Sequence, residues 1–171
     1  MIKIIGAIFL IGGATIMGMG ASAALTSREK SLKGFLEALH IMHSEIGERL
    51  TPIDELMKIL AETASIPVSI LFEECVREMT EKPDVPFCLI WRKEVKRAEY
   101  LKLKPSESDT IAALGNVLGR YGADEQKRGI EHTIRCVDSM HAAASEEKKR
   151  LGGLYAKLGL ICGIAVVIVF I

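Results

Sequence analysis

Two pairs of side chains in this sequence have the spacing of metal ligands. His40 and His43 are three residues apart, and His132 and Cys136 are four apart, so each pair would share one face of a helix. Imidazole and thiolate are ligands that zinc prefers, but a zinc site needs at least three ligands from the protein. Neither pair has a third ligand nearby or a partner pair of the C-x-x-C form. We therefore interpret these residues as structural or surface side chains and predict no metal and no cofactor.

The sequence also lacks the motifs of several large enzyme classes. It has no G-x-x-x-x-G-K-[ST] phosphate-binding loop, no G-x-G-x-x-G and no G-x-S-x-G. Its 22 basic and 22 acidic residues cancel, whereas a nucleic-acid-binding protein usually shows a basic excess on one face. We predict a protein that is not an enzyme and does not bind nucleic acid. Active transport would need an ATPase supplied by another chain.

The four cysteines favour a reducing compartment. Cys162 lies in an apolar run, and Cys75 falls on an apolar helical stripe, which is typical of free, buried thiols in the cytoplasm. If the middle of the chain were exported instead, a disulfide bond among Cys75, Cys88 and Cys136 would become plausible.

Charge is confined to the middle of the chain. Residues 4–25 and 158–171 carry none, whereas 21 basic and all 22 acidic residues lie between them. The first run would form a helix of about 33 Å, which is enough for a hydrocarbon core near 30 Å. The second run reaches only about 21 Å, so its helix must begin near Leu151, with the Lys157 ammonium reaching back to the interface. We predict membrane helices at residues 1–25 and 151–171 and a helical domain at residues 26–150.

Small residues recur in both apolar ends. Ala14, Gly18 and Ser22 are spaced four apart, and Gly159 and Gly163 form a G-x-x-x-G pair. Such spacing lets two membrane helices approach closely, so these five residues are candidates for helix packing. Glycine and alanine are also common in membrane helices without any packing role, and the sequence leaves both interpretations open.

The charges beside the apolar ends predict a cytoplasmic domain. Basic residues are enriched on the cytoplasmic side of membrane helices. Both ends follow this pattern, because the residues that flank the runs on the domain side are Arg28, Lys30, Lys33, Lys148, Lys149 and Arg150.

A second topology fits the N-terminus. Lys3, an apolar run and then Ala21-Ser22-Ala23 have the layout of a cleavable signal peptide. The alternative is an exported helical binding module, cleaved after Ala23 and tethered by its C-terminal helix.

The middle region has the 3.6-residue periodicity of helices and almost no alternation. Apolar residues predict a first helix over residues 27–50. Further helices are predicted to begin at Pro52, with Thr51 as its cap, and near Pro67, Pro86, Pro105 and Asp124. The last helix is expected to continue into the bilayer. The fold class is therefore all-α, a compact six-helix bundle between an N-terminal and a C-terminal membrane helix.

One ordered series of residues points to a family. The series runs through Phe35-Leu36-Glu37-Ala38-Leu39, Glu45-Ile46, Thr51-Pro52-Ile53, Leu56, Leu71-Phe72, Trp91, Leu118-Gly119 and Gln126-Lys127. Together with the two apolar ends, it resembles stage III sporulation protein AB over the whole chain. One departure is that Gly122 occupies a position where the family tends to have an acidic residue.

The resemblance implies a role that composition alone does not. Members of the family act in endospore-forming bacteria, in a complex that spans the two membranes between mother cell and forespore. Their helical domain is similar to the cytoplasmic domains of type II secretion and type IV pilus inner-membrane platform proteins, which contact a hexameric secretion ATPase. The implied partners are membrane lipid, an ATPase of the stage III sporulation protein AA type and other proteins of the channel complex, with self-association also compatible. The implied location is the cell membrane, with the domain in the mother-cell cytoplasm.

Two mixed-charge stretches, residues 92–97 and 127–135, are candidate contact surfaces for those partners. Both have the pattern of solvated helix faces, in which oppositely charged residues pair at a spacing of four. If the chain is a platform, we expect contacts through their cations, which are Arg92, Lys93, Lys96, Arg97, Lys127, Arg128 and Arg135.

Overall fold

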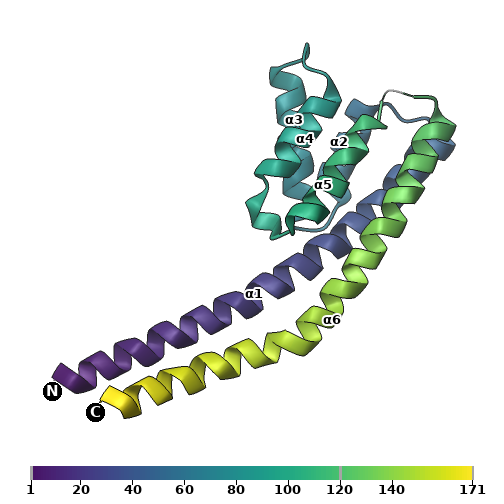
Figure 1. The fold of residues 1–171 in the computed structure, drawn as a ribbon. Helices are drawn as coiled ribbons and strands as arrows, with labels where there is room; N and C mark the ends of the chain where they lie inside the picture. The colour runs from purple at the N-terminus through teal and green to yellow at the C-terminus, as the bar shows by residue number, and fades with distance from the viewer. Residues whose placement is uncertain (1, 120, 171) are drawn as a thin grey trace. The chain divides into compact units, whose positions relative to one another are not determined.

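The computed structural model describes the backbone of residues 2–119 and 121–170 and the side chains of residues 20–119 and 121–152. Over that backbone the chain forms six α-helices and no strand, which confirms the all-α prediction. The helices are α1 (Ile2–Ser44), α2 (Ile53–Thr63), α3 (Val68–Glu81), α4 (Phe87–Arg97), α5 (Pro105–Ala113) and α6 (Ala123–Phe170), as Figure 1 shows. The chain divides into two compact units, residues 30–142 and residues 1–29 with 143–171.

The N-terminal part of the chain is more continuous than predicted. Sequence analysis placed a boundary between an apolar segment ending at residue 25 and a helix beginning at residue 27, whereas α1 runs unbroken from Ile2 to Ser44. The junction contains neither glycine nor proline. The Thr26 hydroxyl donates to the Ser22 carbonyl at 3.1 Å, which satisfies the polar group within the helix.

The predicted capping role of Thr51 is wrong. A π-helical turn, Glu45–Arg49, follows α1, and Leu50 then adopts a left-handed conformation at φ 55°. The Thr51 hydroxyl donates to the Glu45 carboxylate at 2.8 Å, and Arg49 donates to the same carboxylate at 2.8 Å. Pro52 precedes α2 as its N-cap residue instead of occupying its first turn. The nearly buried Glu45 therefore organises this turn, and Leu50 is turned outward with 69% exposure.

The core of residues 30–142 centres on Trp91, which is fully buried. Its indole N–H donates to the Ile111 carbonyl at 2.8 Å, and its ring stacks on Phe72 and Phe87 with centroids 5.9 and 6.1 Å apart. Apolar residues at helical spacing supply most of the remaining buried core. These include Leu32, Phe35, Leu39, Met42, Leu56, Met57, Leu60, Leu71, Ile111, Ile130 and Val137.

Side-chain hydrogen bonds to the backbone stabilise the starts of α5 and α6. The Glu107 carboxylate accepts from the Lys104 backbone N–H at 2.8 Å, at the start of α5. Before α6, the Gln126 side-chain amide accepts from the Gly119 N–H at 3.0 Å and donates to the Tyr121 carbonyl at 2.7 Å. Gly119 has φ +73°, a conformation that favours glycine. The turn between α5 and α6 is therefore held by a side chain that reaches back from α6.

The side chains that the structure describes include only small parts of the two predicted membrane helices. Among the residues whose side chains the structure describes, no helix is sufficiently long and apolar to span a bilayer. Most of the predicted segments 1–25 and 151–171 lie outside those residues.

Candidate functional site

In the unit formed by residues 1–29 and 143–171, two crossed ion pairs join α1 to α6. Arg28 Nη1 lies 2.6 Å from Glu147 Oε2, and Lys148 Nζ lies 3.3 Å from Glu29 Oε2. On α1 the positive Arg28 precedes the negative Glu29. On α6 the negative Glu147 precedes the positive Lys148, so the charges of the two helices are complementary. The Arg28 side chain is only 7% exposed, which makes this pair less screened by solvent than an ordinary surface pair. We call these four residues the charged clasp.

One predicted helix-packing residue lies beside the clasp. A Cβ on Gly152 of α6 would lie 3.7 Å from the Ser22 hydroxyl oxygen of α1, so these two small residues face each other. The side chains of the other four predicted positions, Ala14, Gly18, Gly159 and Gly163, lie outside the described residues. Their packing role stays a prediction.

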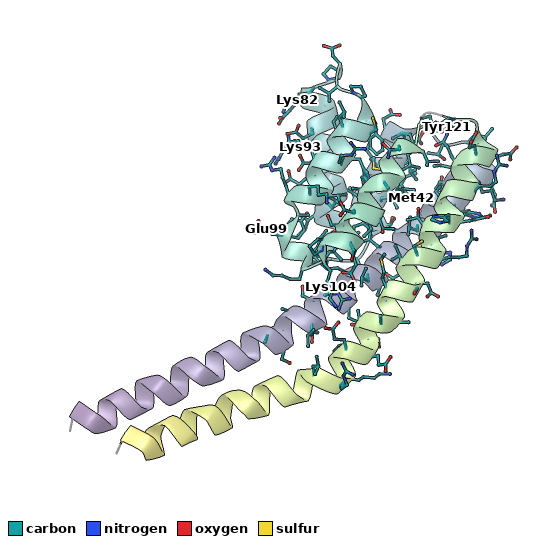
Figure 2. All side chains as sticks on the ribbon, in the orientation of Figure 1. Met42, Lys82, Lys93, Glu99, Lys104 and Tyr121 are labelled. Carbon is teal, nitrogen blue, oxygen red and sulfur yellow. The ribbon has the colours of Figure 1, made fainter. Side chains whose placement is uncertain are left out.

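The predicted partner-binding cations of α4 are largely engaged within the domain. Lys93 Nζ contacts the Glu78 carboxylate of α3 at 2.8 Å and the Glu94 carboxylate at 3.2 Å. Lys82 approaches the same Glu78 carboxylate at 2.9 Å. Figure 2 shows Lys82 and Lys93 on the same side of the α3–α4 pair.

Hydrogen bonds from Lys93 and Lys82 lower the pKa of Glu78 to about 2. The same contact with Glu78 raises the pKa of Lys93 above its ordinary value. The two lysines and the nearly buried Glu78 carboxylate form an ion-pair cluster that links α3 to α4. The cluster is therefore not a free anion-binding surface.

The remaining cations of this stretch are also paired. Lys96 contacts Asp109 of α5, Arg97 lies 3.6 Å from Glu94, and Arg92 donates to the Asn116 side-chain oxygen at 3.0 Å. These side chains therefore make contacts within the domain while they stay partly exposed.

The three cations of the second predicted stretch, residues 127–135, differ in their surroundings. The aliphatic part of Lys127 lies against Gly47, with its Cδ 3.3 Å from where a Cβ would stand. Arg128 and Arg135 are exposed on α6. Sequence reasoning treated these cations alike, because a neighbour on another helix leaves no mark in the local pattern.

The two pairs with metal-ligand spacing were interpreted as structural or surface side chains. His43 Nε2 lies 3.0 Å from the Glu131 carboxylate, a contact that lowers the pKa of Glu131. Cys136 Sγ lies 3.9 Å from His132 Nδ1. Among the described residues, no group of three or more histidine, cysteine or acidic side chains is placed to hold a metal ion.

The cysteines whose side chains the structure describes carry free thiols. Cys75 is buried, and this burial, with nearby carboxylates, raises the pKa of its thiol to about 12. It is therefore protonated and unreactive at neutral pH. Cys88 and Cys136 are partly exposed.

Sequence reasoning missed a groove in the residue 30–142 unit that is lined by both apolar and polar residues. It consists of two adjoining cavities of about 500 and about 570 Å³. They adjoin because Asp54, Met79, Pro86 and Phe87 line both. We call this feature the α2–α4 groove, and its remaining lining residues are Ile53, Lys58, Val76, Thr80, Lys82, Pro83, Val85, Cys88, Leu89, Leu118 and Gly119.

A signal for the groove was present in the sequence. Val85 lies between Pro83 and Pro86, and Leu89 falls outside the buried stripe of α4 formed by Ile90, Trp91 and Val95. Neither residue fits the core pattern, and both are exposed in the structure. Apolar residues outside the stripe are therefore the sequence feature that marks this surface.

The fold and the charged clasp define a class of protein. The chain is an all-α protein in which a helical domain is flanked by long helices that are joined by a charged clasp.

Comparisons with known proteins make the class specific. The family model for stage III sporulation protein AB matches residues 3–171. Stage III sporulation protein AB of Bacillus subtilis (strain 168) is 23% identical over 169 residues, which cover 98% of each chain. A solved structure of a stage III sporulation protein AB has a TM-score of 0.65 and 22% identity, and the match covers 72% of this chain and 98% of that one. At that identity, the structural likeness establishes the fold.

This chain belongs to the stage III sporulation protein AB family, as its ordered residues suggested. The relatives are named as sporulation proteins and not as enzymes.

Proposed function

We propose that this chain is a non-enzymatic membrane platform of the sporulation channel between mother cell and forespore, and that its helical domain docks a secretion-type ATPase. Family membership supplies the link to sporulation. The likeness to secretion platforms noted above supplies the expected role, and the ATPase would be of the stage III sporulation protein AA type.

The charged clasp is the observation that best supports the platform arrangement. Its α1 residues follow the uncharged run 4–25 by three and four positions, and its α6 residues precede the run 158–171. Because the ion pairs hold the two helices together at that point, we expect both apolar runs to enter the membrane from the same side. Basic residues beside both runs favour the cytoplasmic side.

The two topologies differ in the N-terminus of the mature protein. Helix α1 passes through Ala21, Ser22 and Ala23 without a break in the uncleaved chain, as a signal peptide can before cleavage. N-terminal sequencing of the membrane-extracted protein separates the two topologies. Retention of Met1 would contradict cleavage after Ala23, and a new N-terminus at Ala24 would contradict the platform.

Co-purification tests the ATPase partnership directly. The full chain and the ATPase are expressed together, solubilised in a mild detergent and isolated through a tag on the chain. We expect the ATPase to be retained in a fixed ratio. Retention no greater than that by a membrane protein of matched charge would contradict the docking role.

A further inference from the structure

We propose that Lys149 and Arg150 of α6 bind the phosphate groups of anionic phospholipids, an inference that rests on the membrane location in the proposed function. Both side chains are exposed, and neither makes an ion pair with any residue whose side chain the structure describes. In the sequence they follow the α6 residues of the charged clasp and directly precede residue 151, where the C-terminal membrane helix is predicted to begin. They are therefore cations without an ion-pair partner beside a segment that we expect to lie in lipid.

The contacts between α1 and α6 show that the two helices are antiparallel beside the clasp. Ser22 of α1 faces Gly152 of α6, and Arg28 contacts Glu147. An advance of six residues along α1 thus corresponds to a return of five residues along α6. This register shows which positions of the two helices lie at the same level.

The register places the two cations level with the end of the N-terminal apolar run. Leu25, the last residue of that run, is midway between the two α1 contact residues. The midpoint of the two α6 contact residues falls between Lys149 and Arg150. The headgroup region extends about 5–8 Å beyond the hydrocarbon core on each side, and a helix advances only about 1.5 Å per residue. With the hydrocarbon core ending at Leu25, both cations lie at the depth of the lipid phosphates.

The acidic neighbours do not cancel this positive charge. Glu29 and Glu147 each contact a cation of the clasp, which leaves the clasp without net charge. Glu146 is exposed and, among the described residues, forms no ion pair with Lys149 or Arg150. It lies about 5–6 Å along the helix from these cations, on the side away from the apolar segment. Two positive charges next to the lipid therefore stand against one negative charge farther from it.

The chemistry of the two side chains suits an anionic phosphodiester. The guanidinium of Arg150 has parallel N–H groups for two phosphate oxygens, and Lys149 adds a compact positive charge. Basic residues next to a membrane are attracted to anionic leaflets, and each one favours anionic over neutral lipid by about fivefold. A zwitterionic headgroup carries its own ammonium group, which offsets the phosphate charge. A preference for anionic lipid is therefore the measurable consequence.

The test measures which lipid the full chain retains. The chain is reconstituted into vesicles of equal parts phosphatidylglycerol and phosphatidylcholine, extracted in a mild detergent and purified, and its bound lipids are quantified by mass spectrometry. We expect the wild type to retain phosphatidylglycerol over phosphatidylcholine by at least about fivefold. The double variant Lys149→Gln/Arg150→Gln should lose this preference. The exchange Lys149→Arg/Arg150→Lys should keep it, because the charge is unchanged.

The double variant Arg128→Gln/Arg135→Gln is the matched control. Both of its cations are exposed on the same helix, but they lie at least about 21 Å along it from Lys149. We expect this control to keep the wild-type preference. Loss of the preference in the control, or an unchanged preference in Lys149→Gln/Arg150→Gln, would overturn the assignment. Displacement of phosphatidylglycerol by inorganic phosphate beyond that by chloride at the same ionic strength would also overturn it, in favour of a free phosphate ligand.

Flotation of the vesicles separates failure of this inference from failure of the proposed function. Wild-type chain that floats with the vesicles but retains both lipids equally would overturn the lipid contact and leave the membrane platform standing. Wild-type chain that does not float with them would contradict the membrane platform and, with it, this inference. Circular dichroism checks that every variant keeps the helical content of the wild type.

Discussion

Glu78 is a nearly buried residue of α3 that lies between two lysines, and its pKa of about 2 makes the stability of the domain depend on pH. In the unfolded chain this carboxyl has its ordinary pKa of 4.5, so acid protonates the unfolded state first. The stabilisation is therefore fully present above about pH 4.5 and is lost as the pH falls toward 2.

We predict that Glu78→Gln makes the free energy of unfolding less dependent on pH between pH 4.5 and pH 2. The free energy of unfolding of the wild type should fall between pH 4.5 and pH 2 more steeply than that of the variant. Urea unfolding of the detergent-solubilised chain, followed by fluorescence of the single tryptophan, Trp91, measures both. Lys93→Gln removes the largest cause of the shift and should flatten the same window. Parallel profiles for all three proteins would contradict the assignment.

Gly115 lies directly under the ring of Trp91. A Cβ at this position would come within 2.6 Å of the Trp91 Cδ1 atom, which is closer than packed atoms tolerate. We predict that Gly115→Ala lowers the free energy of unfolding by about 1–3 kcal/mol, the usual cost of overpacking. Gly122→Ala is the matched control, because nothing lies within 4 Å of its added methyl group. Equal stability of the two variants in urea would mean that Trp91 can move aside.

The sequence predicts the burial of some of these residues better than the contacts of others. Phe72 and Trp91 were expected in the core because the helical period alone places them inward. The role of Gly115 was not expected, because a glycine in a sequence does not show what lies above it. Glu78 was missed for a similar reason, since one of its two lysines comes from a different helix.

Among the elements, α1 and α6 depend on each other through the charged clasp. The Arg28 side chain is nearly buried, so its pairing with Glu147 is less screened by solvent than that of an exposed pair. We predict that Arg28→Glu and Glu147→Arg each destabilise the chain, and that the double exchange recovers about 1–3 kcal/mol of the loss.

A double-mutant cycle monitored by circular dichroism measures this coupling. The exposed pair Lys33–Glu37 serves as the control, because its side chains are 65% and 50% exposed. Its coupling should stay below about 1 kcal/mol. A coupling at Arg28–Glu147 no larger than at Lys33–Glu37 would show that the clasp does not hold the helices together.

The elements that begin with a proline were the most predictable. Helices α2 to α5 begin at, or one residue after, Pro52, Pro67, Pro86 and Pro105, since proline suits a helix start and breaks a helix interior. The end of α1 was less predictable. Residues 45–50 keep the apolar spacing of a helix, yet the Glu45 carboxylate draws the chain into a π-helical turn through contacts with Arg49 and Thr51.

At the scale of the whole molecule, the α2–α4 groove arises from several elements. The α2–α4 groove combines residues of α2, α3 and α4 with Leu118 and Gly119, which are distant in sequence. Helical periodicity predicts which face of each helix is buried, but it does not predict where three helix ends leave a hollow. The charged stretches were the surface that the sequence pattern led us to select, and the structure shows that the cations of residues 92–97 contact neighbours within the domain.

The central claim is that the helical domain faces the cytoplasm, where an ATPase can reach it. Protease protection in intact cells stripped of their wall tests this most directly, with antibodies against a segment within residues 30–142 as the readout. The account predicts that this segment survives until the membrane is opened and is then degraded. Degradation from outside in intact cells would contradict the account, and would make the exported module, with disulfide bonding among Cys75, Cys88 and Cys136, the better description.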